Sequence, residues 1–171
     1  MCIRDRCILV SELFEIAPLK SRHADRILDT MNDEKTAHMG DRYPDSKGLE
    51  VAYLRQFFEV RRASGKSDDG VIINYVNPGW CMSDLIREDK RVLPRLIMSV
   101  MGRSTEQGSR TLVHAAGAGP DSDGQYQCNA KSTDISGTWV GTKDGLETSQ
   151  KVYSEVNEKL EKIQPGVTAN I

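Results

Sequence analysis

Tyr43 and Lys47 are the two residues of this chain whose types and spacing suggest proton chemistry. Side chains four residues apart lie one above the other on the same face of a helix. A lysine ammonium beside a phenol favours the phenolate and lowers the pKa of the phenol. A tyrosine tuned in this way can pass a proton to or from the oxygen of a carbonyl or an alcohol. The same spacing also occurs at the solvated start of an ordinary amphipathic helix, so the pair alone leaves both interpretations open.

Two short apolar runs flank this pair and indicate buried strands. Residues 7–10 (Cys-Ile-Leu-Val) and 71–76 (Val-Ile-Ile-Asn-Tyr-Val) are nearly unbroken in apolar character, as is typical of parallel strands buried on both faces. Ser11 ends the first run and Pro78-Gly79 follows the second. With a helix from Tyr43 to about Arg62 between them, a βαβ unit would bring these positions to the sheet edge where ligands bind. Ser11 by itself equally suits a residue that turns the chain.

Local patterns predict four further elements and one loop. Residues 125–128 read as a third strand, and residues 146–163 form an amphipathic last helix. Ser104 with Gln107 predicts a capping box that opens a helix to about Ala116. Ser21 is a candidate cap for an earlier helix that includes Ile27 and Met31. The polar run from Lys131 to Lys143 predicts a loop.

Composition predicts one soluble, globular, cytoplasmic domain. The chain has 171 residues, of which 38% are hydrophobic and 28% charged. A net charge of -2 argues against nucleic acid or an anionic membrane surface as the main partner, and no apolar run approaches a membrane span. The cysteines show no paired spacing and no zinc pattern, so we expect no metal site and a reducing compartment. They are Cys2, Cys7, Cys81 and Cys128.

The first six residues differ in character from the rest of the chain. Met1–Arg6 (Met-Cys-Ile-Arg-Asp-Arg) is what the adapter of transposon-based sequencing libraries encodes when it is translated, so we interpret residues 1–6 as an adapter-derived artefact. Residues 7–171 are then the native part. The alternative is an ordinary charged N-terminus. Genomic coding sequence that runs through residues 1–6 would refute the artefact hypothesis.

With these segments in this order, the chain resembles the short-chain dehydrogenase/reductase family, and in particular its fungal retinol-dehydrogenase-like branch. Tyr43-Pro-Asp-Ser-Lys47 resembles the family's Tyr-x-x-x-Lys signature, and residues 8–12 resemble the strand that carries its serine. Residues 74–79 resemble the turn under the nicotinamide. Residues 103–110 and 123–126 resemble the last helix and strand of the branch.

The resemblance implies an α/β fold, the C-terminal part of a Rossmann-type doubly wound parallel sheet. The N-terminal strands and the glycine-rich turn that holds the cofactor pyrophosphate are missing from this sequence. Residues 7–171 would therefore be an incomplete catalytic domain.

The resemblance also implies roles for individual residues. Tyr43 would be the general acid/base, Lys47 would tune it and bind the nicotinamide ribose, and Ser11 would hold the substrate carbonyl. NAD or NADP would be the cofactor, with NADP slightly favoured, and binding to this chain alone is not expected. The segment Trp80–Arg103 would be a lid over a small carbonyl or alcohol substrate. The resemblance allows a homo-oligomer of the full-length protein. The cofactor-binding residues would be Tyr43, Lys47, Pro78, Gly79, Cys81 and Ser83.

A second interpretation belongs to a different class. The chain as written would be a non-catalytic truncated fragment that cannot bind cofactor and at most acts as a helix-mediated interaction module. A glycine-rich turn encoded upstream in the gene favours the oxidoreductase, whereas a native start codon at Met1 favours the fragment.

Overall fold

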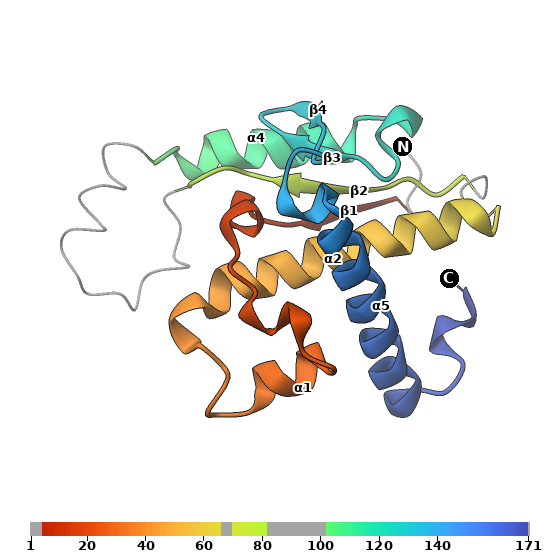
Figure 1. Cartoon of the computed structure of the whole chain (residues 1–171). Helices are drawn as coiled ribbons and strands as arrows, with labels where there is room; N and C mark the ends of the chain where they lie inside the picture. The colour runs from red at the N-terminus through yellow and green to blue at the C-terminus, as the bar shows by residue number, and fades with distance from the viewer. Residues whose placement is uncertain (1–4, 66–69, 82–101, 171) are drawn as a thin grey trace. The chain divides into compact units, whose positions relative to one another are not determined.

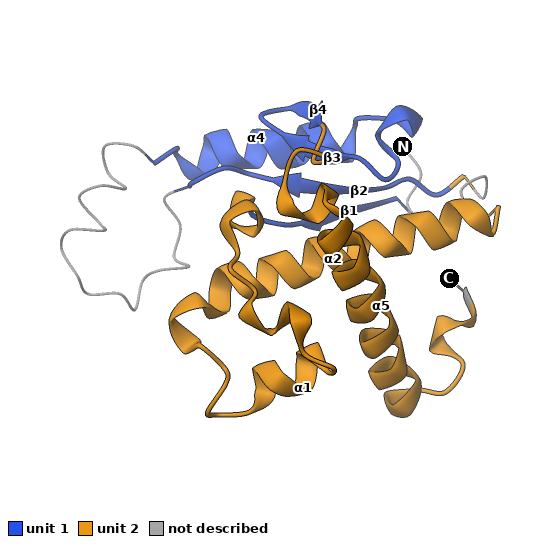
Figure 2. Cartoon of the chain, viewed as in Figure 1, with its two compact units in different colours: residues 1–11, 71–133 blue, residues 12–70, 134–171 orange. Residues whose placement is uncertain are grey.

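The computed structural model describes residues 5–65, 70–81 and 102–170. These residues form two compact units whose segments alternate along the chain (Figure 2). Unit 1 consists of Met1–Ser11 and Val71–Thr133, and unit 2 consists of Glu12–Gly70 and Asp134–Ile171. The chain therefore leaves unit 1 directly after Ser11 and re-enters it just before its second strand.

Unit 1 is built on a four-stranded sheet with the order β1-β2-β3-β4 (Figure 1). β1 (Arg6–Leu9), β2 (Ile73–Asn77) and β3 (Tyr126–Cys128) run parallel, which confirms the predicted α/β class. The three predicted strands correspond to these elements to within two residues at each end. The rings of Tyr75 and Tyr126 on neighbouring strands lie 5.5 Å apart and are almost fully buried.

The prediction of a loop from Lys131 to Lys143 was wrong at its start, and a 3-10 helix at Trp139–Gly141 and the first residue of α5 also fall within it. Lys131–Thr133 form β4, which pairs antiparallel with β3. Asn129 and Ala130 lie between the strands with φ angles of 53° and 56°. Two positive φ angles in a two-residue connection match the right-handed twist of a hairpin. Such turns are recognised in a sequence by glycine, and Asn-Ala does not carry that signal.

The helix of unit 1, α4 (Thr105–Ala116), begins as predicted. The Ser104 hydroxyl accepts a hydrogen bond from the Gln107 backbone N–H, and the Gln107 side chain accepts one from the Ser104 N–H, so the capping box is confirmed. At its other end, the buried Asn74 amide of β2 donates to the Ala115 carbonyl at 2.7 Å. This bond fixes the end of α4 against the sheet.

Unit 2 is helical, with α1 (Ile27–Asn32), α2 (Arg42–Ala63) and α5 (Lys143–Ile163) around one apolar core. The rings of Tyr53 on α2 and Tyr153 on α5 stack with centroids 5.2 Å apart. Both long helices match the sequence expectation to within three residues. The core residues are Leu19, Ile27, Met31 and Val152, with Leu49, Tyr53, Trp139 and Val156 packed against them. Short 3-10 helices cover Glu12–Ile16, Lys20–His23, Met39–Asp41, Trp139–Gly141 and Val167–Asn170 in unit 2, and Pro120–Ser122 in unit 1.

The predicted cap of the first helix was wrong. Ser21 lies buried inside the Lys20–His23 3-10 helix, and α1 begins only at Ile27. Its first backbone N–H groups are satisfied by Glu155 of α5, whose two carboxylate oxygens accept from Ile27 at 2.8 Å and from Leu28 at 2.9 Å. The positive end of the α1 dipole also stabilises the negative charge of this carboxylate.

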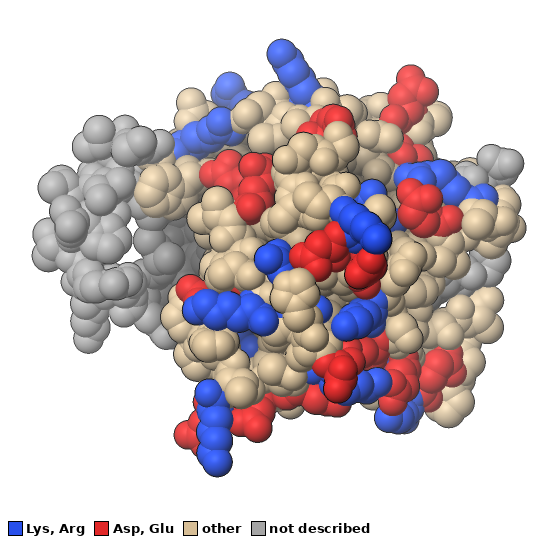
Figure 3. All heavy atoms as spheres, in the orientation of Figure 1, with Lys and Arg blue, Asp and Glu red and all other residues tan. Residues whose placement is uncertain are grey.

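Acidic and basic side chains are intermixed on the face shown in Figure 3. In unit 2, Glu158 accepts hydrogen bonds from both Arg26 and Lys162 at 2.6 Å, which lowers the pKa of the Glu158 carboxyl to about 2. Within the described ranges, no helix combines the length and apolar character needed to cross a bilayer.

Candidate active site

Tyr43 and Lys47 lie in the first two turns of α2. Pro44 fits this position because the N–H that proline lacks would have no helical partner in a first turn. Tyr43 is 41% exposed, and the Lys47 side chain is 21% exposed. The spacing of four residues places both on one face of the helix, as the sequence predicts.

The opposite face of the same turns is anchored within unit 2. Asp45 is 4% exposed, and its carboxylate accepts a hydrogen bond at 2.8 Å from the N–H of Leu19. The backbone N–H of Leu19 needs this acceptor because the residue is fully buried. Leu19 also has a φ of 35°. One turn later, a Cβ at Gly48 would lie only 2.9 Å from the Cβ of Ala17 and 3.3 Å from the Trp139 ring. These contacts fix the first turns of α2, which carry Tyr43 and Lys47.

We expect Asp45→Ala to destabilise the protein by about 1–3 kcal/mol, because the buried N–H of Leu19 would lose its acceptor. The measurement is denaturant unfolding of the complete gene product. Asp41→Ala is the control, because the Lys20–Asp41 ion pair is exposed and such pairs contribute about 0–1 kcal/mol. Equal effects of the two substitutions would show that Asp45 does not anchor the helix.

Ser11 and the Pro78-Gly79 turn lie at the same edge of the unit 1 sheet. Leu9 is level with Val76 in the ladder, and the Val10 N–H donates to the Val76 carbonyl at 2.9 Å. Ser11 and Pro78 each come two residues after the paired Leu9 and Val76. The parallel register thus brings Ser11 next to the turn at the carboxyl end of β2, which is the ligand-binding edge of open α/β sheets.

The Asn77 side chain closes this turn by a hydrogen bond that was not predicted from the sequence. Its side chain is 2% exposed, and its carbonyl oxygen accepts from the Gly79 N–H at 3.0 Å. Gly79 has a φ of 81°, and a Cβ there would lie 2.7 Å from Arg103 Nη1. The positive φ therefore favours glycine in this turn, whereas the Arg103 guanidinium is the end of a flexible side chain and could move aside. An asparagine two residues before a glycine is the signal that could have found this interaction.

Cys81 is held inside unit 1 by its own turn. Its thiol donates to the Pro78 carbonyl at 3.4 Å, and a Cβ at Gly108 of α4 would collide with the sulfur. A cofactor contact by Cys81 stays a prediction. Ser83, and residues 82–101 of the predicted lid, lie outside the described residues.

Tyr43 and Lys47 thus lie on one helix face in unit 2, and Ser11, Pro78 and Gly79 lie at one end of the sheet in unit 1. A single site that unites the two groups stays a prediction. The predicted site residues therefore lie partly on a helix and partly at the carboxyl ends of the strands.

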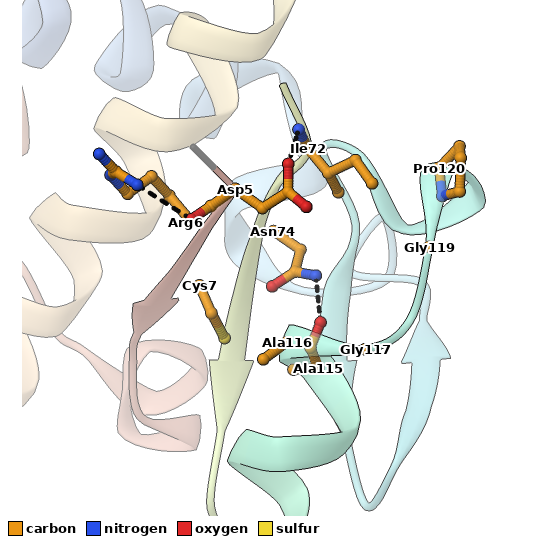
Figure 4. A pocket seen from close by; sticks show the side chains of 10 residues that line it. All are labelled: Asp5, Arg6, Cys7, Ile72, Asn74, Ala115, Ala116, Gly117, Gly119 and Pro120. Atoms are coloured by element: carbon orange, nitrogen blue, oxygen red, sulfur yellow. Dashed lines mark hydrogen bonds between the residues drawn. The ribbon is translucent and has the colours of Figure 1, made fainter. Parts of the chain in front are cut away.

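A cavity of about 490 Å³ in unit 1 lies away from the predicted edge (Figure 4). Its lining comes from the start of β1, the start of β2 and the end of α4. Most of these residues are small or apolar, and the buried carbonyl oxygen of the Asn74 side chain has no hydrogen-bond partner among the described residues. They are Asp5, Arg6, Cys7, Ile72, Asn74, Ala115, Ala116, Gly117, Gly119 and Pro120. The predicted site residues that the structure describes all lie outside this lining.

Comparison with known proteins decides the family. The chain is 42% identical over 155 residues to the short chain dehydrogenase/reductase dmxR8 of Cryptosporiopsis sp. (strain 8999), covering 90% of this chain and 47% of that protein. It is 38% identical over 128 residues to the short chain dehydrogenase atnD of Emericella nidulans, covering 72% and 40% respectively. The short-chain dehydrogenase anuD of Penicillium roqueforti is 30% identical over 161 residues, covering 91% and 41%. The chain belongs to the short-chain dehydrogenase/reductase family.

The match to this family concerns the C-terminal part of its fungal members. The chain spans 40–49% of the length of the curated relatives that it matches. No model of a protein family matches the chain, and no solved structure matches it. Membership of an oxidoreductase family is thereby established from the curated relatives.

Short-chain dehydrogenases/reductases generally use a nicotinamide cofactor. The Lys47 ammonium can donate to ribose hydroxyls, and the Gly79 turn presents backbone without a side chain at the sheet edge. The sequence has no G-x-G-x-x-G turn to hold the pyrophosphate. The sequence therefore offers a donor for ribose hydroxyls but no such turn for the pyrophosphate.

Proposed function

We propose that this chain is the C-terminal portion of an NAD(P)-dependent oxidoreductase that interconverts a carbonyl and an alcohol, with Tyr43 as general acid/base. The observation that carries the proposal is the Tyr43–Lys47 pair on one face of α2, in a chain whose curated relatives are named short-chain dehydrogenases. A phenol beside an ammonium is suited to moving a proton at a substrate oxygen.

The three residues have different tasks in this mechanism. Tyr43 gives a proton to the carbonyl oxygen during reduction and takes one from the alcohol during oxidation. Lys47 favours the phenolate form of Tyr43 and donates hydrogen bonds to the cofactor ribose. Ser11 donates a hydrogen bond to the substrate oxygen and stabilises the negative charge that develops there.

NAD or NADP would be held by Tyr43, Lys47 and the Pro78-Gly79 turn, with Cys81 and Ser83 beside them. When bound, the cofactor supplies the hydride transfer. The substrate would be a small carbonyl or alcohol compound that enters beside the segment Trp80–Arg103. We further propose a cytoplasmic location and allow a homo-oligomer of the complete protein.

The test is an assay of the complete gene product with NADH and NADPH against a panel of aldehydes and ketones, run in both directions. We expect turnover with one cofactor at least. Absence of cofactor binding by calorimetry, in a protein shown to be folded, would contradict the proposal.

We expect Lys47→Ala in the complete gene product to weaken cofactor affinity and to lower the rate, because one residue serves both the ribose and Tyr43. Calorimetric titration of the cofactor and steady-state kinetics measure the two effects. Affinity and turnover that both stay at the wild-type values would count against these roles of Lys47.

A further inference from the structure

We propose that Glu50 is a positioning residue for Lys47, an inference that rests on the proposed function. The Glu50 carboxylate accepts a hydrogen bond from the Lys47 ammonium at 2.7 Å. Nothing in the family resemblance assigned a role to Glu50. Positions 43, 47 and 50 have the spacing that places all three side chains on one face of α2.

The setting of this ion pair separates it from an ordinary surface pair. The Lys47 and Glu50 side chains are 21% and 30% exposed. The Glu59–Arg62 pair has the same i,i+3 spacing on the same helix and a similar distance of 2.8 Å, but its side chains are 53% and 56% exposed. Water screens the exposed pair more strongly, so the Lys47–Glu50 pair holds its geometry better.

The helix beneath the pair is itself fixed. Gly48 and Val51, which flank Glu50 on the other side of α2, are buried, and Gly48 lies in close contact with Ala17 and Trp139. The backbone that carries Lys47 and Glu50 therefore has little freedom. With the backbone held, the hydrogen bond to Glu50 restricts the rotamers of the long Lys47 side chain.

A restrained ammonium binds a ribose at a lower entropy cost than a mobile one. An ordered rotamer-rich side chain has already lost the freedom that binding would otherwise remove. An ammonium carries three N–H donors, so donating one to Glu50 is compatible with donating others to the ribose hydroxyls. Glu50 would thus act on the cofactor only through Lys47.

The experiment is a double-mutant cycle on the dissociation constants of NADH and NADPH, measured by fluorescence titration of the complete gene product. We expect Glu50→Ala to raise the dissociation constant of the preferred cofactor about five- to tenfold. Glu50→Gln keeps an acceptor oxygen and should raise it only about two- to threefold. In the Lys47→Ala background, both substitutions should have no further effect. Glu59→Ala is the matched control and should leave the dissociation constant unchanged.

The possible outcomes separate this inference from the proposed function. If Lys47→Ala leaves cofactor binding unchanged, the role of Lys47 in the proposed function is wrong, and this inference is wrong with it. If Lys47→Ala weakens binding but Glu50→Ala does not, or does so equally in both backgrounds, only the positioning role is overturned. If Glu50→Ala does not fold, Glu50→Gln carries the cycle, and its effect must vanish in the Lys47→Ala background.

Discussion

Tyr43→Phe in the complete gene product is expected to lower turnover by about 10²–10⁴-fold while leaving cofactor affinity nearly unchanged. The substitution removes only the hydroxyl that would exchange a proton with the substrate oxygen. The Ser46 hydroxyl donates to the Tyr43 backbone carbonyl at 2.7 Å. This bond in the first turn of α2 is kept in the variant, because the substitution leaves the backbone unchanged. The measurement pairs steady-state rates with a calorimetric dissociation constant for the cofactor.

Tyr53→Phe is the matched control on the same helix. The Tyr53 hydroxyl donates to the Asn157 side chain of α5 at 3.1 Å, so its loss should cost about 0.5–1.5 kcal/mol of stability. Turnover by this variant should stay close to that of the wild type. Near-full activity of Tyr43→Phe would rule out the acid/base role of Tyr43, whatever the control shows.

The 171-residue chain expressed by itself is expected to show no dehydrogenase activity and poor solubility. A doubly wound sheet holds its cofactor across the switch point between two halves, and this chain matches only 40–49% of the length of its curated relatives. The sequence offers no glycine-rich turn for the pyrophosphate. We therefore expect this chain alone not to bind the cofactor.

The exposed edge strand β1 is expected to lower the solubility of the chain. β1 stands at the end of the strand order, and its Leu9 side chain is 51% exposed. An edge strand with exposed apolar side chains is a template for pairing with other chains. The largely apolar cavity beside β1 adds to this surface. A few hundred Å² of apolar surface left in water costs several kcal/mol at about 25 cal/mol per Å². This cost is comparable to the net stability of a whole domain, about 5–15 kcal/mol.

The test is to express residues 7–171 and to measure solubility, thermal melting and calorimetric binding of NAD(H) and NADP(H). Leu9→Lys should improve solubility, because a charge on an edge strand blocks pairing, but it should not create cofactor binding. A soluble monomer with a cooperative melt and micromolar cofactor affinity would contradict the prediction. The complete gene product, treated identically, is the positive control.

The sequence by itself determined the elements whose signals are local. The apolar runs at residues 7–10 and 71–76 predicted the positions of β1 and β2. The predicted burial holds for β2 but was wrong for β1, which stands at the end of the strand order and has three exposed residues among its four. The Ser104–Gln107 capping box marked the start of α4, since both hydrogen bonds lie within four residues. The order of these segments with Tyr43-x-x-x-Lys47 also predicted the family that the curated relatives confirm.

Tertiary structure alone decided the features whose partners are distant in the chain. Glu155 of α5 accepts hydrogen bonds from the first N–H groups of α1, although it lies more than 100 residues away in the chain. No pattern near Ser21 could therefore reveal where α1 begins. Asp45 lies inside the Tyr-x-x-x-Lys segment, yet its role as acceptor for the Leu19 N–H depends on how residues 12–23 fold onto α2. The hairpin at Asn129-Ala130 exists because β3 offers β4 a partner, which outweighs the unfavourable positive φ of alanine. For Ile27 and Leu19, a buried backbone N–H had to find an acceptor, and a residue distant in the chain supplied it.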